Sequence, residues 1–424
     1  MNEHFDALET RDPAEREQAQ MVALASQLAH AQAHTTAFAE LLAGFEPAAL
    51  VDRAALARLP VTRKSELLAR QQAQRAQDVF GGFSAIGWAG QVRGSGARKG
   101  FQSPGPIYEP EGAGADYWRV ARALFAAGFR AGDLAHNSFS YHLTPAGSMM
   151  ESGAHALGCT VFPGGVGNTE LQLQAAAELR PQGYVGTPSF LKILLDKAAE
   201  SGAGAAAVGS ITKALLSGEA FPSALRDWLA ARGVAGYQCY ATADVGLIAY
   251  ETSAREGLVL DEGVIVEIVR PGSGDPVPDG EVGEVVVTTL NRDYPLIRFG
   301  TGDLSAVLPG TCPTGRTNRR IKGWLGRADQ SAKVRGMFVH AGQVAEIVRR
   351  FPAVGRARLV VEGEMAQDRM TLKVEIDGAP PEGLDAQLAA AIREITKLRG
   401  EVAFVASGTL PNDGRVIEDA RRYD

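Results

Sequence analysis

Residues 211–243 read ITKALLSGEAFPSALRDWLAARGVAGYQCYATA and contain three consecutive elements. ITKALLSG is short and apolar and predicts a buried strand, and GYQCYATA predicts a second strand. Between them, PSALRDWLAARG predicts a helix, because its proline stands near the first turn, where the missing N–H is tolerated. A strand, a helix and a strand in this order indicate a βαβ unit and a largely parallel sheet.

The same alternation extends towards the N-terminus. Strands are expected at 159–165 and 183–188, and helices at 14–44 (one helix or two), 116–128, 168–179 and 188–200. In parallel sheets, ligands bind beyond the carboxyl ends of the strands, where glycine-rich loops gather. We therefore expect a ligand site on that edge.

The pattern changes at about residue 256. Residues 257–269 and 280–291 are strand-rich and hairpin-like, which predicts an antiparallel β subdomain. Further on, 368–377 alternates with a period of two, and 385–398 has its apolar residues on one helical face. The α/β fold class therefore has two parts: a large N-terminal domain, 1–328, and a small α+β C-terminal domain, 329–424.

Composition excludes several classes of protein. The chain has 424 residues, a formal charge of -6 and 45% hydrophobic residues, so we expect a folded protein without a nucleic-acid partner. Its three cysteines show no paired spacing, which favours a reducing compartment. No signal peptide is visible and no apolar run approaches the ~20 residues of a membrane span, so we expect a cytoplasmic protein without a membrane partner.

Residues 91–105, QVRGSGARKGFQSPG, form a glycine-rich loop, in which the seven residues 94–100 hold three glycines, a serine and two cations. Small residues let several backbone N–H groups point at one anion, so the loop could hold a phosphate. It matches neither GxxxxGK[ST] nor GxGxxG, the usual spellings of phosphate-binding loops. From the residues alone, a phosphate site and a surface loop both remain open.

Two segments carry a resemblance to a known family. YPLIRFGTGDLSAV, at 294–307, resembles the YPxIRYRTGD signature of the AMP-forming adenylating enzymes. GRADQSAKVRGMFVHAGQVAEIV, at 326–348, resembles their GRxDDxxxxRGxNVxPxxIE segment. GCTVFPGGVGNTELQLQ, GTPSF and LLSGEAFPSALRDWL are similar to phenylacetate–CoA ligase, one branch of that superfamily. The resemblance runs from about residue 20 to the end, in the same order.

The resemblance implies the adenylate-forming enzyme fold, whose small C-terminal domain is a mobile lid. It implies a ligase that activates an aryl or similar small carboxylic acid as an acyl-adenylate and transfers it to coenzyme A. Its cofactors would be ATP or AMP, Mg²⁺ and coenzyme A, and relatives are often homodimers. Zinc is not expected, because Thr252 and Val259 replace a Cys…His pair and the CPTG that starts at Cys312 replaces Cys-x-Cys-Gly.

The resemblance also assigns a nucleotide site. Asp303 would accept hydrogen bonds from the ribose hydroxyls, Tyr240 would stack on adenine, and Arg327 would approach ribose or phosphate. Each assignment competes with an ordinary role, as a turn residue, a core residue or an ion-pair partner. The remaining expected nucleotide-binding residues are Ser95, Gly96, Ser217, Gly218 and Glu219.

The chain departs from the family where the phosphates should bind. Ala97 and Arg98 replace two threonines, and Lys99 replaces a glycine, so charge would stand in for hydroxyl donors. Arg415 stands near the place of the family's C-terminal lysine, which neutralises charge at the α-phosphate. We therefore name Lys99, Arg327 and Arg415 as catalytic candidates. Asp244 replaces a glutamate and could reach magnesium.

The acid pocket and the hinge complete the expected site. Phe139 and Tyr141 would be aromatic walls, with His142 and Thr144 making the pocket more polar. Asp329 would be the hinge, and Gly336 would flank the pantetheine tunnel. Two alternatives follow from the altered motifs: a weakened relative that binds nucleotide or acyl-CoA without efficient adenylation, or an enzyme that retains only the thioester-forming half-reaction.

Overall fold

The computed structural model describes residues 3–90, 95–200, 208–270, 274–328, 331–335, 337–363, 368–411 and 416–421. The chain divides into two compact units. The first consists of Met1–Gly218 and Trp228–Leu325, and the second of Glu219–Asp227 and Gly326–Asp424.

The larger sheet of the first unit has the strand order β14-β15-β10-β9-β8-β7-β6-β4-β5. Its parallel half confirms the predicted βαβ alternation, since β8-β7-β6-β4-β5 all pair in parallel. These strands are β4 (Leu134–Asn137), β5 (Thr160–Pro163), β6 (Gly183–Gly186), β7 (Lys213–Leu216) and β8 (Ala235–Thr242). The helices between them are α6 (Ala146–Ala156), α7 (Thr169–Leu179), α8 (Pro188–Glu200) and α10 (Ser223–Ala230).

The antiparallel part is divided between two sheets. The large sheet continues through β9 (Gly246–Glu251), β10 (Leu258–Leu260), β15 (Arg320–Ile321) and β14 (Val307–Leu308). A second sheet contains β1 (Thr62–Arg63), β13 (Phe299–Ser305), β12 (Gly283–Thr289) and β11 (Val264–Val269) in this order. The predicted antiparallel pairing of 257–269 with 280–291 is confirmed for β11 and β12, while β10, from the same predicted run, joins the large sheet. Asp261 turns the chain between β10 and β11, because its carboxylate accepts from Gly263 N and pairs with Arg119.

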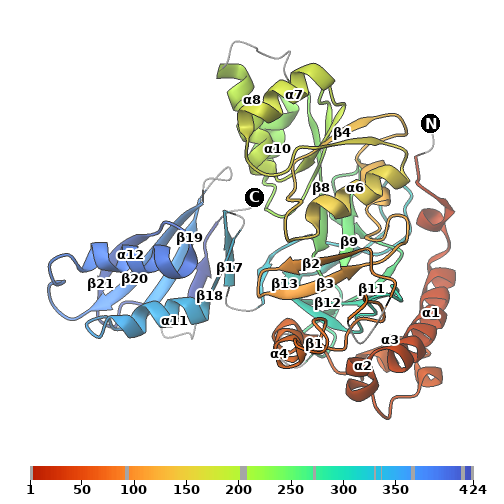
Figure 1. Ribbon diagram of the computed structural model, residues 1–424, viewed down its shortest axis with the longest axis horizontal. Coiled ribbons are helices and arrows are strands. Elements are labelled where there is room, and N and C mark those ends of the chain that lie inside the picture. Colours follow the sequence, from red (N-terminus) through yellow and green to blue (C-terminus); the bar gives the residue numbers. More distant parts are fainter. Residues whose placement is uncertain are drawn as a thin grey trace. The chain divides into compact units, whose positions relative to one another are not determined.

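The first two α-helices meet at a capping residue, Thr35. The predicted helical region 14–44 forms α1 (Pro13–His34) and α2 (Thr36–Leu41), which are separated at Thr35, whose hydroxyl accepts a hydrogen bond from Phe38 N. Helix α5 (Ala121–Ala126) is shorter than predicted, because Asp116 and Arg119 adopt positive φ angles before it begins. The other elements here are η1 (Ala7–Thr10), η2 (Pro47–Ala49), α3 (Arg53–Ala57), α4 (Lys64–Gln74), β2 (Lys99–Ser103) and β3 (Ile107–Glu111). Helices α7 and α8 lie at one end of the unit, and α2, α3 and α4 at the other (Figure 1).

The second unit has an α+β core, as expected. Its sheet has the order β21-β20-β19-β22, and α11 and α12 lie on one face of it (Figure 1). Alternate residues of β20, from Met370 to Ile376, are buried against Leu388 and Ile392 of α12. Its elements are β16 (Gly326–Arg327), β17 (Ser331–Val334), β18 (Met337–His340), α11 (Ala341–Arg350), β19 (Ala357–Glu362), β20 (Arg369–Ile376), α12 (Leu384–Thr396), β21 (Glu401–Ala406) and β22 (Ile417–Asp419).

In the described part of the chain, no helix combines the length and the apolar character that crossing a bilayer requires.

Candidate active site

The segment Thr301-Gly302-Asp303 in β13 (Phe299–Ser305) carries a buried carboxylate. Gly302 has a φ of 74°, a conformation that glycine adopts without steric cost. The Thr301 hydroxyl donates to Val285 O at 2.9 Å and accepts from Asp303 N at 3.1 Å, which fixes the backbone at the carboxylate. Asp303 is 7% exposed. The turn therefore holds an acidic side chain in one place.

Two side chains bind the Asp303 carboxylate from different elements. The Tyr240 hydroxyl, on β8, donates to Oδ2 at 2.8 Å, and Trp324 Nε1 donates to Oδ1 at 3.0 Å. The Tyr240 hydroxyl also lies 3.2 Å from Thr301 Oγ1. The structure thus brings together Asp303 and Tyr240, which the sequence assigned to one nucleotide site, and adds Trp324.

Ser217 and Gly218 follow β7 at the carboxyl edge of the parallel sheet. The Ser217 hydroxyl donates to Cys239 O on the neighbouring strand at 2.9 Å, next to Tyr240 in sequence. Gly218 has a φ of 82° and is exposed, and Glu219 is half-buried. Glu219 belongs to the segment that groups with the second unit.

The glycine-rich loop is described from Ser95 onwards, and Gly94 lies outside the described residues. Ser95 and Gly96 are exposed, and their backbone bonds to Gly87: Gly87 N donates to Ser95 O, and Ala97 N donates to Gly87 O. A Cβ on Gly96 would lie 2.9 Å from Ile86 Cγ2. Only glycine therefore allows this close approach.

Lys99 is bound within the first unit. Its ammonium donates to Ser148 Oγ at 2.5 Å and lies 3.2 Å from Glu111 Oε1. Glu111 in turn accepts from Ser148 and from Trp118 Nε1, each at 2.8 Å. The charge of Lys99 is therefore balanced by a buried glutamate.

Arg98 contrasts with its neighbour. It is exposed, and among the described residues its guanidinium has no hydrogen bond or ion pair. Its backbone N–H donates to Glu111 O at 2.7 Å, which anchors the residue. Of the two loop cations, Arg98 is the one available to an anion.

Asp244 lies in a buried charged cluster. Its Oδ2 accepts from Lys64 Nζ at 2.8 Å, and its side chain is 1% exposed. The neighbouring Glu109 is fully buried and accepts a hydrogen bond from Ser103. Burial, and then the negative charge of Asp244, raise the pKa of Glu109 well above its usual value, which favours its neutral form.

Lys64 disfavours a direct magnesium ligand at Asp244 Oδ2, while Oδ1 is buried without a hydrogen-bond partner among the described residues. The ammonium of Lys64 already occupies the cation position beside Asp244, and a second cation there would be repelled. Among the described residues, no group of three histidine, cysteine, aspartate or glutamate side chains could hold a metal ion. Cys312, which stands where some relatives have a zinc cluster, contacts two hydroxyls. Its sulfur lies 3.1 Å from Thr314 Oγ1 and 3.5 Å from Thr252 Oγ1.

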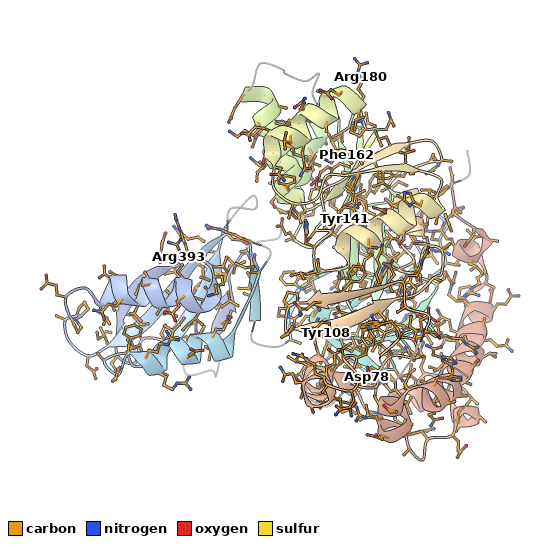
Figure 2. All side chains as sticks on the ribbon, in the orientation of Figure 1. Asp78, Tyr108, Tyr141, Phe162, Arg180 and Arg393 are labelled. Atoms are coloured by element: carbon orange, nitrogen blue, oxygen red, sulfur yellow. The ribbon has the colours of Figure 1, made fainter. Side chains whose placement is uncertain are left out.

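The expected acid pocket begins where β4 ends. Phe139 is buried in the core, while Tyr141 is half-buried and accepts a hydrogen bond from Asn137 Nδ2 at 2.9 Å (Tyr141 is labelled in Figure 2). Asn137 also donates to Gly147 O at 2.9 Å. A Cβ on Gly147 would lie 2.9 Å from the Tyr141 ring, so the ring packs directly on this glycine. Asn137 and Gly147 together fix the aromatic wall.

His142 and Thr144 form the turn that follows. His142 N donates to Ser140 Oγ at 3.1 Å, and Thr144 N donates to His142 O at 2.7 Å. The His142 side chain is exposed and Thr144 is half-buried. Phe139 and Tyr141 are therefore the more enclosed members of the expected pocket.

The expected hinge and lid residues are described only in part. Arg327 is half-buried on β16. Asp329, Gly336 and Arg415 lie outside the described residues.

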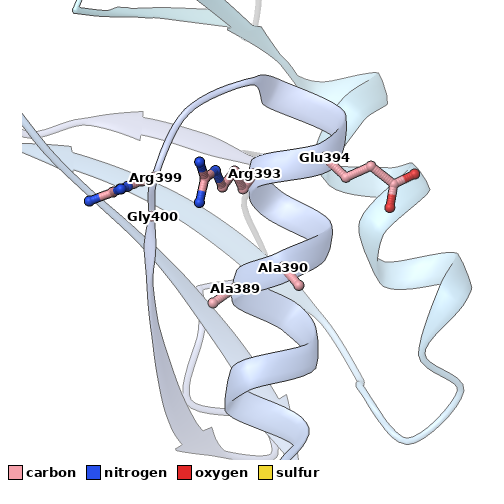
Figure 3. A pocket seen from close by; sticks show the side chains of 6 residues that line it. All are labelled: Ala389, Ala390, Arg393, Glu394, Arg399 and Gly400. Carbon is pink, nitrogen blue, oxygen red and sulfur yellow. The ribbon is translucent and has the colours of Figure 1, made fainter.

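The second unit carries a separate hollow at the end of α12 (Figure 3). It is lined by Ala389, Ala390, Arg393, Glu394, Arg399 and Gly400. Glu394 pairs with Arg350 at 3.0 Å. Among the described residues, this lining includes none of those that the sequence assigned to a site.

Sequence reasoning did not find Trp324, Lys64 or Asn137. Trp324 stands just before the Gly-Arg of the quoted segment 326–348, so its position offered a signal. Lys64 and Asn137 offered none, since a lysine at a helix start and an asparagine at a strand end are common. Their partners became visible only in three dimensions.

Comparisons of sequence and fold relate this chain to known proteins. The family model of the AMP-binding enzymes matches residues 138–291. A phenylacetate-coenzyme A ligase from Thermus thermophilus is 34% identical over 264 residues, which cover 61% of this chain and 59% of the relative. One from Aromatoleum evansii is 34% identical over 271 residues, which cover 62% and 61%. The chain thus spans about three fifths of the length of the curated relatives it matches.

The fold is also that of a solved acyl-CoA ligase. The crystal structure of 2-hydroxyisobutyryl-CoA ligase in complex with 2-HIB-AMP and CoA has a TM-score of 0.79 with this chain, at 24% identity. The likeness covers 98% of this chain and 92% of that one. The chain therefore has the fold of that ligase. Over about three fifths of its length, its sequence is similar to the phenylacetate–CoA ligases.

Proposed function

We propose that the chain is an AMP-forming ligase that converts an aryl or similar small carboxylic acid to its coenzyme A thioester. The observation that carries the proposal is the Asp303 carboxylate, held by the Tyr240 hydroxyl in the segment that resembles the family signature. The AMP-binding family match and the relatives' names support it.

The reaction has two steps. A carboxylate oxygen of the acid attacks the α-phosphorus of ATP, and the bond to pyrophosphate breaks. The sulfur of coenzyme A then attacks the acyl carbon, the bond to AMP breaks, and the thiol proton passes to solvent. One site serves both steps in this proposal, because the acyl-adenylate stays bound between them.

The ribose and the adenine would be held chiefly by Asp303 and Tyr240. Asp303 would accept from the ribose hydroxyls, since a carboxylate offers about four acceptor positions and can take donors besides Tyr240 and Trp324. The Tyr240 ring would stack on adenine while its hydroxyl stays on Asp303. The adenine edge would be lined by Ser217, Gly218 and Glu219, with Arg327 at ribose or phosphate.

The phosphates require positive charge from the loop and from the C-terminal segment. Arg98 would supply it in the loop, next to the backbone of Ser95 and Gly96, and Arg415 would act at the α-phosphate. A guanidinium gives two parallel donors to one phosphate, so it can replace hydroxyl donors with a different geometry. No magnesium ligand is proposed in this protein, because Lys64 holds Asp244.

The acid would lie against Phe139 and Tyr141, with His142 and Thr144 near the entrance. The Tyr141 hydroxyl accepts from Asn137, so the aromatic wall has a polar end. Burial and then Glu151 raise the pKa of Tyr141, so the hydroxyl keeps its proton. An aromatic acid with a polar substituent therefore fits this wall best.

Product analysis tests the proposal. The protein is incubated with ATP, magnesium, coenzyme A and a panel of benzoic, phenylacetic and hydroxylated aryl acids. We expect acyl-CoA and AMP in equal amounts by mass spectrometry for at least one acid. Formation of ADP, or no acyl-CoA from any acid while AMP still binds, would contradict the ligase.

A second candidate is a relative that binds nucleotide or acyl-CoA but does not adenylate efficiently, keeping only the thioester step. Two observations favour it: Lys99 is neutralised by Glu111, and Asp244 is held by Lys64. A synthetic acyl-adenylate distinguishes the candidates. Thioester formation from it, without any product from ATP and acid, would select the second.

A homodimer, as the resemblance implies, and a cytoplasmic location remain predictions. Light scattering during gel filtration tests the first. Fractionation of cells that produce the protein tests the second.

A further inference from the structure

The segment 322–325, which precedes the second unit, is fixed along the end of β13. Lys322 N donates to Ala306 O and Leu325 N donates to Leu304 O, each at 2.9 Å. The Ser305 hydroxyl donates to Gly323 O at 2.6 Å. The chain is therefore anchored on the strand of Asp303 up to the last residue of the first unit.

Trp324 is the side chain of this segment that reaches Asp303. The indole is half-buried, and its N–H donates to Asp303 Oδ1, while the Tyr240 hydroxyl donates to Oδ2. One donor on each oxygen fixes the plane of a carboxylate, and charge-assisted hydrogen bonds are stronger than neutral ones. Loss of the indole N–H would remove the donor on Oδ1 and hold the plane of the carboxylate less firmly.

We infer that Trp324 is a positioning residue for the nucleotide: its indole N–H orients the Asp303 carboxylate so that its oxygens meet the two hydroxyls of a ribose. The inference rests on the proposed nucleotide role of Asp303 and deepens it. The inference concerns the preference in affinity for a ribose over a deoxyribose nucleotide. A carboxylate held in one plane gives a larger preference than a carboxylate that rotates. The side chain that orients Asp303 would then come from segment 322–325, which ends at the last residue of the first unit.

A purely structural role makes a different prediction. If the indole only satisfied a buried carboxylate, its loss would weaken every adenine nucleotide equally, or only lower stability. If it orients the carboxylate, its loss reduces the preference for a ribose over a deoxyribose. The ratio of the two affinities therefore separates the roles.

The test is calorimetric binding of AMP and 2′-deoxy-AMP to the full chain. Trp324→Phe removes the N–H and keeps an aromatic ring. Trp228→Phe is the matched control, because Trp228 is also half-buried but packs against Arg232 and Lys192. We expect AMP to bind wild type and Trp228→Phe about tenfold or more tightly than 2′-deoxy-AMP, as expected for a hydrogen bond to a charged group. In Trp324→Phe the ratio should fall to about threefold or less.

The outcomes separate the inference from the proposed function. Wild type without any AMP binding overturns both. AMP binding with an equal preference for ribose in wild type and Trp324→Phe overturns the inference and leaves the proposed function standing. A loss of preference in both tryptophan variants also overturns it, since the effect would not belong to Trp324.

A measurement on the wild-type chain avoids dependence on one variant's folding. The four tryptophans give four indole N–H signals in a protein labelled with ¹⁵N-tryptophan. Trp88→Phe, Trp118→Phe and Trp228→Phe identify the remaining signal as that of Trp324. We expect AMP to shift this signal more than 2′-deoxy-AMP does at saturation. Equal shifts with both nucleotides would contradict the inference.

Discussion

At the scale of single residues, the site depends on which charges are already paired. Lys99 and Asp244, two residues that the family resemblance placed near the phosphates, both have buried or half-buried ionic partners in this chain. Asp303 and Tyr240, the proposed nucleotide residues, instead bind one another. The structure therefore brings Asp303 and Tyr240 together, while the charges of Lys99 and Asp244 are paired with Glu111 and Lys64.

Replacing Lys64 by Met should leave Asp244 buried without its cation. Breaking a buried ion pair costs about 3–5 kcal/mol, and because Lys64 is 37% exposed, we expect about 1–3 kcal/mol. Urea unfolding measures this loss. The double variant Lys64→Met/Asp244→Asn should recover most of it. Manganese binding to the wild-type chain that disappears in Asp244→Asn would show that Asp244 is a metal ligand after all.

Glu109 gives a prediction for pH. Its pKa is raised by burial and by Asp244, so its contribution to stability is present below about 4.5 and is lost as pH rises through the folded-state pKa. Glu109→Gln removes this loss, because the amide stays neutral. We expect the variant to gain stability over wild type progressively above pH 4.5. A difference in unfolding free energy that stays constant from pH 5 to pH 8 would exclude the titration of Glu109.

At the scale of elements, several of the expected site residues lie at the carboxyl edge of the parallel sheet. Ser217 follows β7, Tyr240 lies near the end of β8 and Tyr141 lies beyond β4, and short apolar runs predicted β7 and β8. The exceptions have local causes, such as the positive φ angles of Asp116 and Arg119, which shorten α5. Apolar periodicity does not report such backbone geometry.

Arg98 and Lys99 are neighbours in the glycine-rich loop, and we expect their substitutions to have different effects. Arg98→Ala should lower the rate of adenylation about tenfold or more, since a charged hydrogen bond to phosphate is lost. Lys99→Met should lower the thermal midpoint through Glu111 and keep most of the rate. Initial rates with saturating acid and thermal unfolding measure both effects. The reverse ranking of the two variants would place Lys99, and not Arg98, at the phosphates.

Helix α6 gives a prediction for the acid pocket. Gly147→Ala places a methyl group against the Tyr141 ring and Ser140 O, and such overpacking costs about 1–3 kcal/mol. We expect a higher KM for the acid and an unchanged Kd for AMP. Thermal unfolding and initial-rate kinetics supply the measurements. An unchanged KM would remove Tyr141 from the pocket wall.

At the scale of the whole molecule, the sequence predicted the βαβ half, the antiparallel part and the α+β C-terminal core. It could not predict that 257–269 divides between two sheets, because both parts are apolar and strand-like. Nor could it predict the pairs Lys64–Asp244 and Trp324–Asp303, since the first joins residues 180 positions apart and the second depends on how 322–325 lies on β13. Pairwise contacts of this kind follow from topology and not from local pattern.

The central claim is that this chain activates a carboxylic acid on ATP with a nucleotide held by Asp303. Carboxylate-dependent exchange of labelled pyrophosphate into ATP measures this step without coenzyme A. We predict exchange above background with at least one aryl acid, and its loss in Asp303→Asn while Trp228→Phe retains it. No exchange with any acid in a preparation that binds AMP, or full exchange in Asp303→Asn, would contradict the claim.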